Sequence, residues 1–281
     1  MKVRNILASL LVAAAGLQTV NAQKVVLTMT DNQVVKYDVQ KVRDITFEEA
    51  APGPQLGEHE YVEIGGLKWA TMNVGATTVA GDYATCCGDY FAWGETETRY
   101  KTMTRTGANS ATFTWKNGYA SGYSNDNWPT YTGTTLDADH DAARKAWGST
   151  WRTPTDAEFK ALANGSDSNA QTSVELINTI TQGGIYRLSS TQTIEPAYTG
   201  IAGILFVSAS DTSKRVFFPA SGYVNDMVLY DGGSRGGYWS STLNTSGTKN
   251  AYRLDFESSG GVSPSDGARR YRGYTVRPVS D

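Results

Sequence analysis

The chain has few of the residues that build metal centres. Its 281 residues include only two histidines and two cysteines. The cysteines, Cys86 and Cys87, are adjacent, so they cannot supply the separated ligands of a zinc site. In an oxidising compartment they would form a strained vicinal disulfide, stay as thiols or pair between chains. We expect no metal site built on these residues.

Catalytic constellations are equally scarce. A serine–histidine–carboxylate site would need His59 or His140, and neither lies near a Gly-x-Ser-x-Gly turn. There is no phosphate-binding glycine-rich loop. Carboxylates are plentiful enough for a glycosidase, but no pair stands out. We therefore predict no catalytic residues and no cofactor, and an enzyme is the least favoured alternative.

Strong charge and long apolar runs are also missing. The net charge is −3, which gives no reason to bind nucleic acid. The apolar run from Ile6 to Leu17 is shorter than the roughly 20 residues that span a bilayer, and no later segment approaches that length. With Lys2 and Arg4 before it and Val20-Asn21-Ala22 after it, this run predicts a signal peptide over residues 1–22. We expect an exported protein, at the periplasm, the cell surface or outside the cell.

Composition divides the remaining chain into three parts. Residues 23–48 form a small β unit, in which β-rich runs at 24–30 and 33–39 flank a hairpin turn at Asp31-Asn32, and 42–47 suit a third strand. Residues 49–60, with two prolines, suit a linker. Residues 61–281 form the main domain.

The C-terminal third predicts an antiparallel sheet. In the run 250–256, Tyr252, Leu254 and Phe256 alternate with Arg253 and Asp255, as in a strand with one buried face. The run 274–279 suits a last strand that ends at a sheet edge near a proline.

A polar stretch over 102–135 lacks periodicity and suggests a long loop. Trp128 and Tyr131 are interleaved there with amides and carboxylates, a combination that suits sugar binding. A packed surface loop is the simpler interpretation.

Two helices are expected after this loop. The first spans 137–147, with Asp137, Asp139 and Asp141 at its start, where carboxylates cap exposed N–H groups. The same spacing suggests calcium, but the glycine and glutamate of an EF-hand loop are missing. The second begins at the capping box of Thr155 and Glu158. A third short helix would fit 173–180.

Ordered motifs from about residue 61 to the end carry a family resemblance. They occupy residues 66–76, 88–96, 141–155, 218–223, 238–241 and 276–279. Together they resemble the Fibrobacter succinogenes major paralogous domain family, which is found in exported bacterial proteins. That resemblance implies an α+β domain with a C-type-lectin-like fold: a twisted antiparallel sheet, two helices and long loops, preceded here by the small β unit.

The resemblance also bears on activity. The family's fold is shared with the formylglycine-generating enzyme, but the separated cysteines of that oxidase are missing here, so its activity is not carried over. Calcium lectins use a Glu-Pro-Asn triplet where this chain has Glu195-Pro196-Ala197. Neither oxidase activity nor calcium-dependent sugar binding is expected.

A further similarity nominates a ligand face. Arg235-Gly236-Gly237-Tyr238-Trp239 resembles a motif of phage tropism determinants, whose ligand face follows it. Together with Trp128 and Tyr131, the resemblance nominates a ligand-binding set: Asn244, Arg253, Asp255, Arg269, Arg270 and Tyr271. For Arg253 and Asp255 the alternative is a salt-bridged scaffold, and Arg277 suits a buried structural charge. We expect a non-enzymatic module that binds a glycan or a protein at the cell surface, with a structural or pilus-associated component as the alternative.

Overall fold

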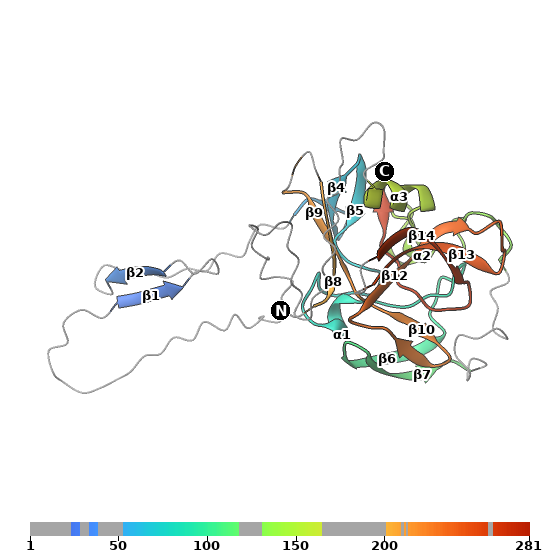
Figure 1. Ribbon diagram of the computed structural model, residues 1–281, viewed down its shortest axis with the longest axis horizontal. Helices are drawn as coiled ribbons and strands as arrows, with labels where there is room; N and C mark the ends of the chain where they lie inside the picture. The colour runs from blue at the N-terminus through green and yellow to red at the C-terminus, as the bar shows by residue number, and fades with distance from the viewer. Residues whose placement is uncertain are drawn as a thin grey trace. The chain divides into compact units, whose positions relative to one another are not determined.

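The computed structural model divides the chain into two compact units, Met1–Ala50 and Ala51–Asp281 (Figure 1). In the first unit only two strands are described. In the second unit the described residues are 53–117, 131–164, 201–208, 211, 213–257 and 261–281. The predicted signal peptide, the possible third strand at 42–47 and the possible helix at 173–180 lie outside the described residues.

The first unit contains the expected hairpin. Strands β1 (Lys24–Thr28) and β2 (Val34–Asp38) pair in antiparallel register, with Lys24 opposite Asp38. The β-rich composition of both runs therefore predicted this hairpin correctly.

The second unit is a mostly β structure, and the α+β lectin-like class expected above is wrong. Strands account for 44% and helices for only 11% of the structure, and the strands form several small antiparallel sheets. A four-stranded sheet has the order β15-β5-β4-β3, and comprises β3 (Gln55–Leu56), β4 (His59–Ile64), β5 (Leu67–Ala70) and β15 (Val279–Ser280). A three-stranded sheet comprises β12 (Arg235–Leu243), β13 (Asn250–Glu257) and β14 (Gly261–Arg269). The two-stranded pairs are β6 (Tyr100–Gly107) with β7 (Ser110–Trp115), β8 (Gly203–Val207) with β9 (Arg215–Pro219), and β10 (Tyr223–Asn225) with β11 (Val228–Tyr230).

Two further expectations need correction. The hairpin β6–β7 occupies the first part of the stretch expected to be a loop over 102–135, up to Trp115. The segment does alternate: Met103, Phe113 and Trp115 are half-buried between exposed threonines. Strand β3 and the start of β4 also lie within the expected linker 49–60.

The helices are short and well capped. Helix α1 (Tyr83–Cys86) was not expected. Helix α2 (Ala142–Trp147) starts later than expected, because Asp141 is its N-cap. Helix α3 (Asp156–Asn164) begins at the predicted capping box, in which Glu158 N–H donates to Thr155 and Thr155 N–H donates to Glu158.

The three-stranded sheet packs one face against α3 (Figure 1). Tyr238, Leu254 and Phe256 on this face join Phe159 of α3 in the main core. At Gly236 an added Cβ would lie 2.1 Å from the Phe256 ring, so only glycine fits beneath that ring. The opposite face, expected to meet water, is also largely covered: Arg253 and Asp255 are only 3% and 7% exposed.

The C-terminal strand closes the four-stranded sheet. Val279 of β15 lies opposite Trp69 of β5, and its backbone also exchanges two hydrogen bonds with Arg152. The strand is at the sheet edge, as the nearby proline predicted, but it is much shorter than the run 274–279.

Candidate functional site

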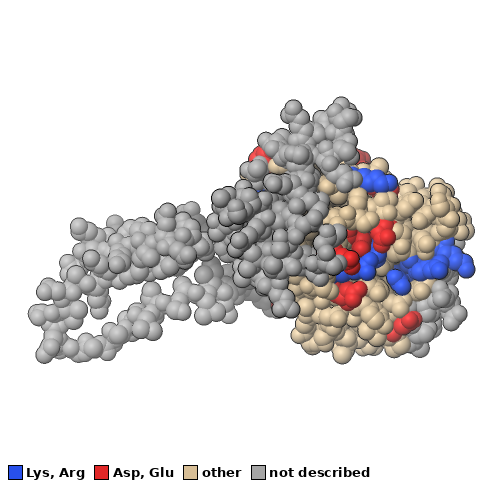
Figure 2. Space-filling model, in the orientation of Figure 1, with Lys and Arg blue, Asp and Glu red and all other residues tan. Residues whose placement is uncertain are grey.

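The β12–β14 sheet carries charged side chains on the face that points away from α3. We call Arg235, Arg253, Asp255 and Asp266 the ion-pair face. Arg235 donates two hydrogen bonds of 2.8 Å to Asp255, and this pairing raises the pKa of Arg235. The Arg253 guanidinium lies 3.2 Å from Asp255 and donates from Nε to Asp266 at 3.2 Å. Figure 2 shows basic and acidic groups side by side on one face of the molecule.

Strand register brings these four residues together. Gly237 of β12 lies opposite Asp255, and Arg253 lies opposite both Trp239 and Asp266. Residues opposite one another share a face of a sheet, so the charges converge. A bulge between Arg253 and Asp255 interrupts the β13–β14 pairing at this point.

A row of tyrosines continues from the ion-pair face to the hairpin β10–β11. We call Tyr274, Tyr223 and Tyr230 the tyrosine ladder. Tyr223 stacks on Tyr274 and on Tyr230, with ring centroids 5.4 Å apart in both pairs. The buried end, Tyr274, fits under Gly237, where an added Cβ would lie 2.4 Å from its ring. The outer end, Tyr230, is 37% exposed beside Met227 and Val228, which are 41% and 46% exposed.

Guanidinium groups lie against this ladder. The Arg253 carbon Cζ is 4.5 Å from the Tyr274 ring centroid, and that of Arg272 is 5.2 Å from the Tyr223 centroid. Burial raises the pKa of the Tyr274 hydroxyl, while Arg253 and Arg272 oppose that rise. Tyr274 is therefore a neutral phenol beside two cations.

Two guanidinium nitrogens near the ladder have no hydrogen-bond partner among the described residues. They are Arg253 Nη1 and Arg272 Nε. The other end of the Arg253 guanidinium contacts Asp255 and Asp266, so this buried charge is only partly satisfied.

The hairpin tip beside the ladder has an unusual backbone. Asp226 and Met227 have φ angles of 45° and 68°. This left-handed turn matches the twist of a two-residue hairpin, but it favours Asn-Gly over a large side chain such as methionine. The fold thus keeps an exposed apolar side chain at a position where glycine would be easier.

The ligand-binding residues that the sequence nominated do not all lie together in the structure. Arg253 and Asp255 belong to the ion-pair face, and Arg269 is exposed at the end of β14. Tyr271 is only 9% exposed and packs in a core cluster with Tyr90 and Val224. Asn244 forms the turn after β12, where its side chain accepts from Ser246 N–H at 3.0 Å. Tyr271 and Asn244 therefore have structural contacts of their own.

A second aromatic group gathers Arg270 and Tyr131. The Arg270 guanidinium lies over the Trp93 ring and donates to the carbonyl of Tyr131. The Tyr131 ring is half-exposed and stacks on His140 at 4.1 Å. Trp128 lies outside the described residues. Tyr131 and Arg270 are thus near each other.

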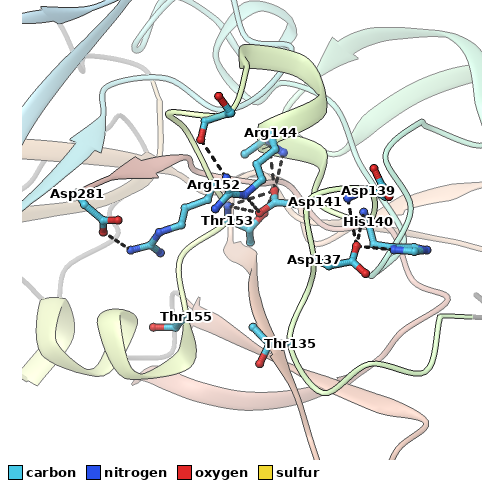
Figure 3. Close-up of polar contacts among 12 residues, drawn as sticks. Thr135, Asp137, Asp139, His140, Asp141, Arg144, Arg152, Thr153, Thr155 and Asp281 are labelled. Atoms are coloured by element: carbon cyan, nitrogen blue, oxygen red, sulfur yellow. Dashed lines mark hydrogen bonds and ion pairs between the residues drawn. The ribbon is translucent and has the colours of Figure 1, made fainter.

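Two aspartates of the triplet, Asp137 and Asp141, cap backbone N–H groups (Figure 3). Asp141 accepts from the N–H groups of Ala143 and Arg144, and also from the N–H and hydroxyl of Thr153. Asp137 instead accepts from His140, which lowers the pKa of Asp137. Among the described residues no group of three or more histidine, cysteine, aspartate or glutamate side chains is arranged to hold a metal. Of the two interpretations of the triplet, capping matches these contacts.

The candidate catalytic and redox residues have packing contacts. His59 stacks on Trp147 at 3.6 Å, and its burial lowers the pKa of the imidazole. The Sγ atoms of Cys86 and Cys87 are 4.0 Å apart, so no disulfide joins them. Both thiols are buried with Ile201, Leu205 and Phe217.

Sequence reasoning missed several residues of the site. Tyr223, Tyr230, Arg272 and Tyr274 were not nominated, although Tyr274 fell within an expected strand. The pairing of Arg235 with Asp255 also went unseen, because it depends on the β12–β13 register. The signal that could have found the hairpin is the alternation of Tyr223, Val224 and Asn225 before the turn at Asp226.

Comparison with known proteins adds one match. The model of a family described as a domain of unknown function, DUF8237, matches residues 199–279. These residues include the ion-pair face and the tyrosine ladder. No curated protein and no solved structure shows significant similarity to the chain.

The described residues include no helix with the length and apolar character needed to cross a membrane.

Proposed function

We propose that this protein is an exported, non-enzymatic recognition module that binds a glycan or a protein ligand at the bacterial cell surface. Export rests on the signal-peptide pattern of residues 1–22. Membership of the Fibrobacter succinogenes major paralogous domain family is part of the proposal and rests on the ordered motifs.

One observation carries the binding role. The tyrosine ladder runs from a buried charged cluster to an exposed tip, where Met227, Val228 and Tyr230 are the large exposed hydrophobic residues of the described chain. Tyrosine suits recognition because its rigid ring offers contact area at little conformational entropy, and its hydroxyl can bond a polar ligand. The exposed run lies between Asp226 and Asp231, and apolar surface with a polar rim is typical of interaction sites.

The experiment uses the mature chain from residue 23 on a glycan array and in a pull-down of cell-surface proteins. The test variant is Tyr230→Ala, which removes the exposed ring. The matched control is Tyr252→Ala, because Tyr252 is a half-exposed tyrosine on β13, which belongs to a different sheet from Tyr230.

We expect Tyr230→Ala to weaken binding by about tenfold or more, as the loss of a central aromatic contact does. Tyr252→Ala should leave binding within about twofold. A mature protein that binds nothing in either assay, or equal losses in the two variants, would contradict the proposal.

A further inference from the structure

Two neighbouring rings of the tyrosine ladder are placed for covalent cross-linking. Tyr223 of β10 lies directly opposite Tyr230 of β11, and their rings stack with centroids 5.4 Å apart and an angle of 19° between the ring planes. Residues opposite one another in an antiparallel pair share a face, so the register holds the two rings together. Coupling of two phenols depends on such proximity, because a carbon beside each hydroxyl group must meet its counterpart.

An oxidant in solution can reach this pair but not the buried end of the ladder. Tyr230 is 37% exposed, and Tyr223 is half-buried beside it. Tyr274, the third ring, is 0% exposed and fits under Gly237. A radical formed at Tyr230 therefore has the ring of Tyr223 as its stacked phenol, while Tyr274 is held in the core. The exposure of the three rings selects one pair.

The hairpin that carries the pair is short and contains no cysteine. Each of its strands has three residues, and its turn consists of the left-handed Asp226 and Met227. Two-stranded hairpins are marginally stable by themselves. Exported proteins commonly fasten small elements with disulfides, but the cysteines of this chain are the buried, adjacent Cys86 and Cys87. A carbon–carbon bond between the two tyrosines would fasten the hairpin by other chemistry.

We propose that Tyr223 and Tyr230 form a cross-linking site, in which a bond joins ring carbons ortho to the two hydroxyl groups when the protein meets a peroxide-driven one-electron oxidant such as a haem peroxidase. Each phenol gives up one electron and its hydroxyl proton, and the two phenoxyl radicals couple. Each ring then transfers the hydrogen from its coupled carbon to its oxygen and becomes aromatic again. Overall, two C–H bonds break and one C–C bond forms, while hydrogen peroxide takes up the two electrons and two protons and becomes two molecules of water.

The experiment treats the dilute mature chain with a haem peroxidase and hydrogen peroxide, and then maps the product by mass spectrometry. Trypsin releases residues 216–235 as one peptide, which contains both tyrosines and no internal lysine or arginine. A protease that cuts before aspartate then cuts at Asp226, between the two tyrosines. A cross-linked peptide lacks the mass of two hydrogen atoms and stays joined across that cut, whereas an unlinked peptide separates.

Three single substitutions test the assignment. Tyr223→Phe and Tyr230→Phe each keep a ring for stacking and remove the hydroxyl group that forms the radical. Tyr252→Phe is the matched control, because Tyr252 is half-exposed on β13 and its ring lies 5.8 Å from the Lys160 ammonium. We expect the unaltered protein and Tyr252→Phe to give the same yield of linked peptide, and the other two variants to lose it completely.

Free N-acetyltyrosine in a parallel reaction confirms that the oxidant is active. If it couples while peptide 216–235 of the unaltered protein stays unlinked, the proposal is wrong. A link that persists in Tyr230→Phe, or a product in which tyrosines of separate chains are joined in place of these two, would also overturn it. These outcomes do not depend on the ligand, so a chain that binds its ligand without cross-linking would leave the proposed function standing.

Discussion

Two buried arginines in the C-terminal third, Arg277 and Arg253, differ in how completely their guanidinium groups are hydrogen-bonded. Arg277 is 0% exposed, and its guanidinium donates to Asn73 and to the carbonyls of Ala70, Thr71 and Phe217 at 2.6–2.9 Å. Arg253 is 3% exposed, yet its Nη1 has no partner among the described residues.

The difference separates scaffold from site. Arg277 joins β5, the segment that follows it and β9, so its hydrogen bonds hold separate sheets together. Within the described residues, the carboxylate partners of Arg253 lie on its own sheet, and its guanidinium also lies against the Tyr274 ring. A fully satisfied buried polar network rigidifies one structure, and Arg253 is satisfied less completely than Arg277.

The largest expected effect is on Arg277. Replacing it by glutamine leaves several buried carbonyls without donors, so Arg277→Gln should lower the free energy of unfolding by about 3–5 kcal/mol. Urea denaturation followed by tryptophan fluorescence measures this loss. A change below about 1 kcal/mol would show that the carbonyls find other donors, and Arg277 would then not differ from Arg253 as a stabilising residue.

Asp141 is a second buried charge whose hydrogen bonds are made within the fold. Its carboxylate caps α2 and also holds Thr153, so Asp141→Ala should cost about 2–3 kcal/mol. The matched control is Asp137→Ala, whose carboxylate is exposed and caps only a turn. If calorimetry gave the two variants the same unfolding temperature, the second contact to Thr153 would have no energetic weight.

Arg253→Gln should lower the free energy of unfolding less than Arg277→Gln does, although the two arginines are similarly buried. Asp255 keeps its two hydrogen bonds from Arg235, and the half-exposed Asp266 can turn to water. We expect a loss of about 1–2 kcal/mol in the same urea experiment. A loss as large as that of Arg277→Gln would mean that the ion-pair face is scaffold too, as the alternative interpretation of Arg253 and Asp255 holds.

The smallest expected effect is a gain in stability, for a substitution at Met227. Met227 has a φ angle of 68°, a conformation that glycine adopts without strain. Met227→Gly should therefore stabilise the protein by about 0.5–1 kcal/mol while removing part of the exposed tip. Asp226→Gly, at the neighbouring left-handed position, is the comparison, because aspartate tolerates that conformation better. A destabilised Met227→Gly variant would show that the methionine packs where we infer exposure.

Local patterns predicted the parts of the fold that depend on neighbours in the chain. The β1–β2 hairpin and the Thr155–Glu158 capping box follow from composition and spacing. The class of the second unit did not follow, since the motifs suggested an α+β domain where the strands form several small sheets. The β6–β7 hairpin was missed because its inward side chains alternate with threonines, which lowered the apolar signal.

The site was predicted only in part for a similar reason. Arg253 and Asp255 lie two residues apart in one strand, so their proximity is local. The partners Arg235 and Asp266 depend on strand register, and the stacking of Tyr223 on Tyr274 depends on how β10 meets the segment before β15. Such contacts are set by packing, which no pattern in one strand encodes.

The most direct test of the contrast measures both stability and ligand binding in Tyr230→Ala and Arg277→Lys. Because Tyr230 is exposed and Arg277 is fully buried, we expect Tyr230→Ala to retain the unfolding midpoint and lose binding, while Arg277→Lys loses stability and, where still folded, binds normally. If Tyr230→Ala unfolds as readily as Arg277→Lys, or binds as well as the unaltered protein, the tyrosine ladder is scaffold, and the recognition site lies elsewhere.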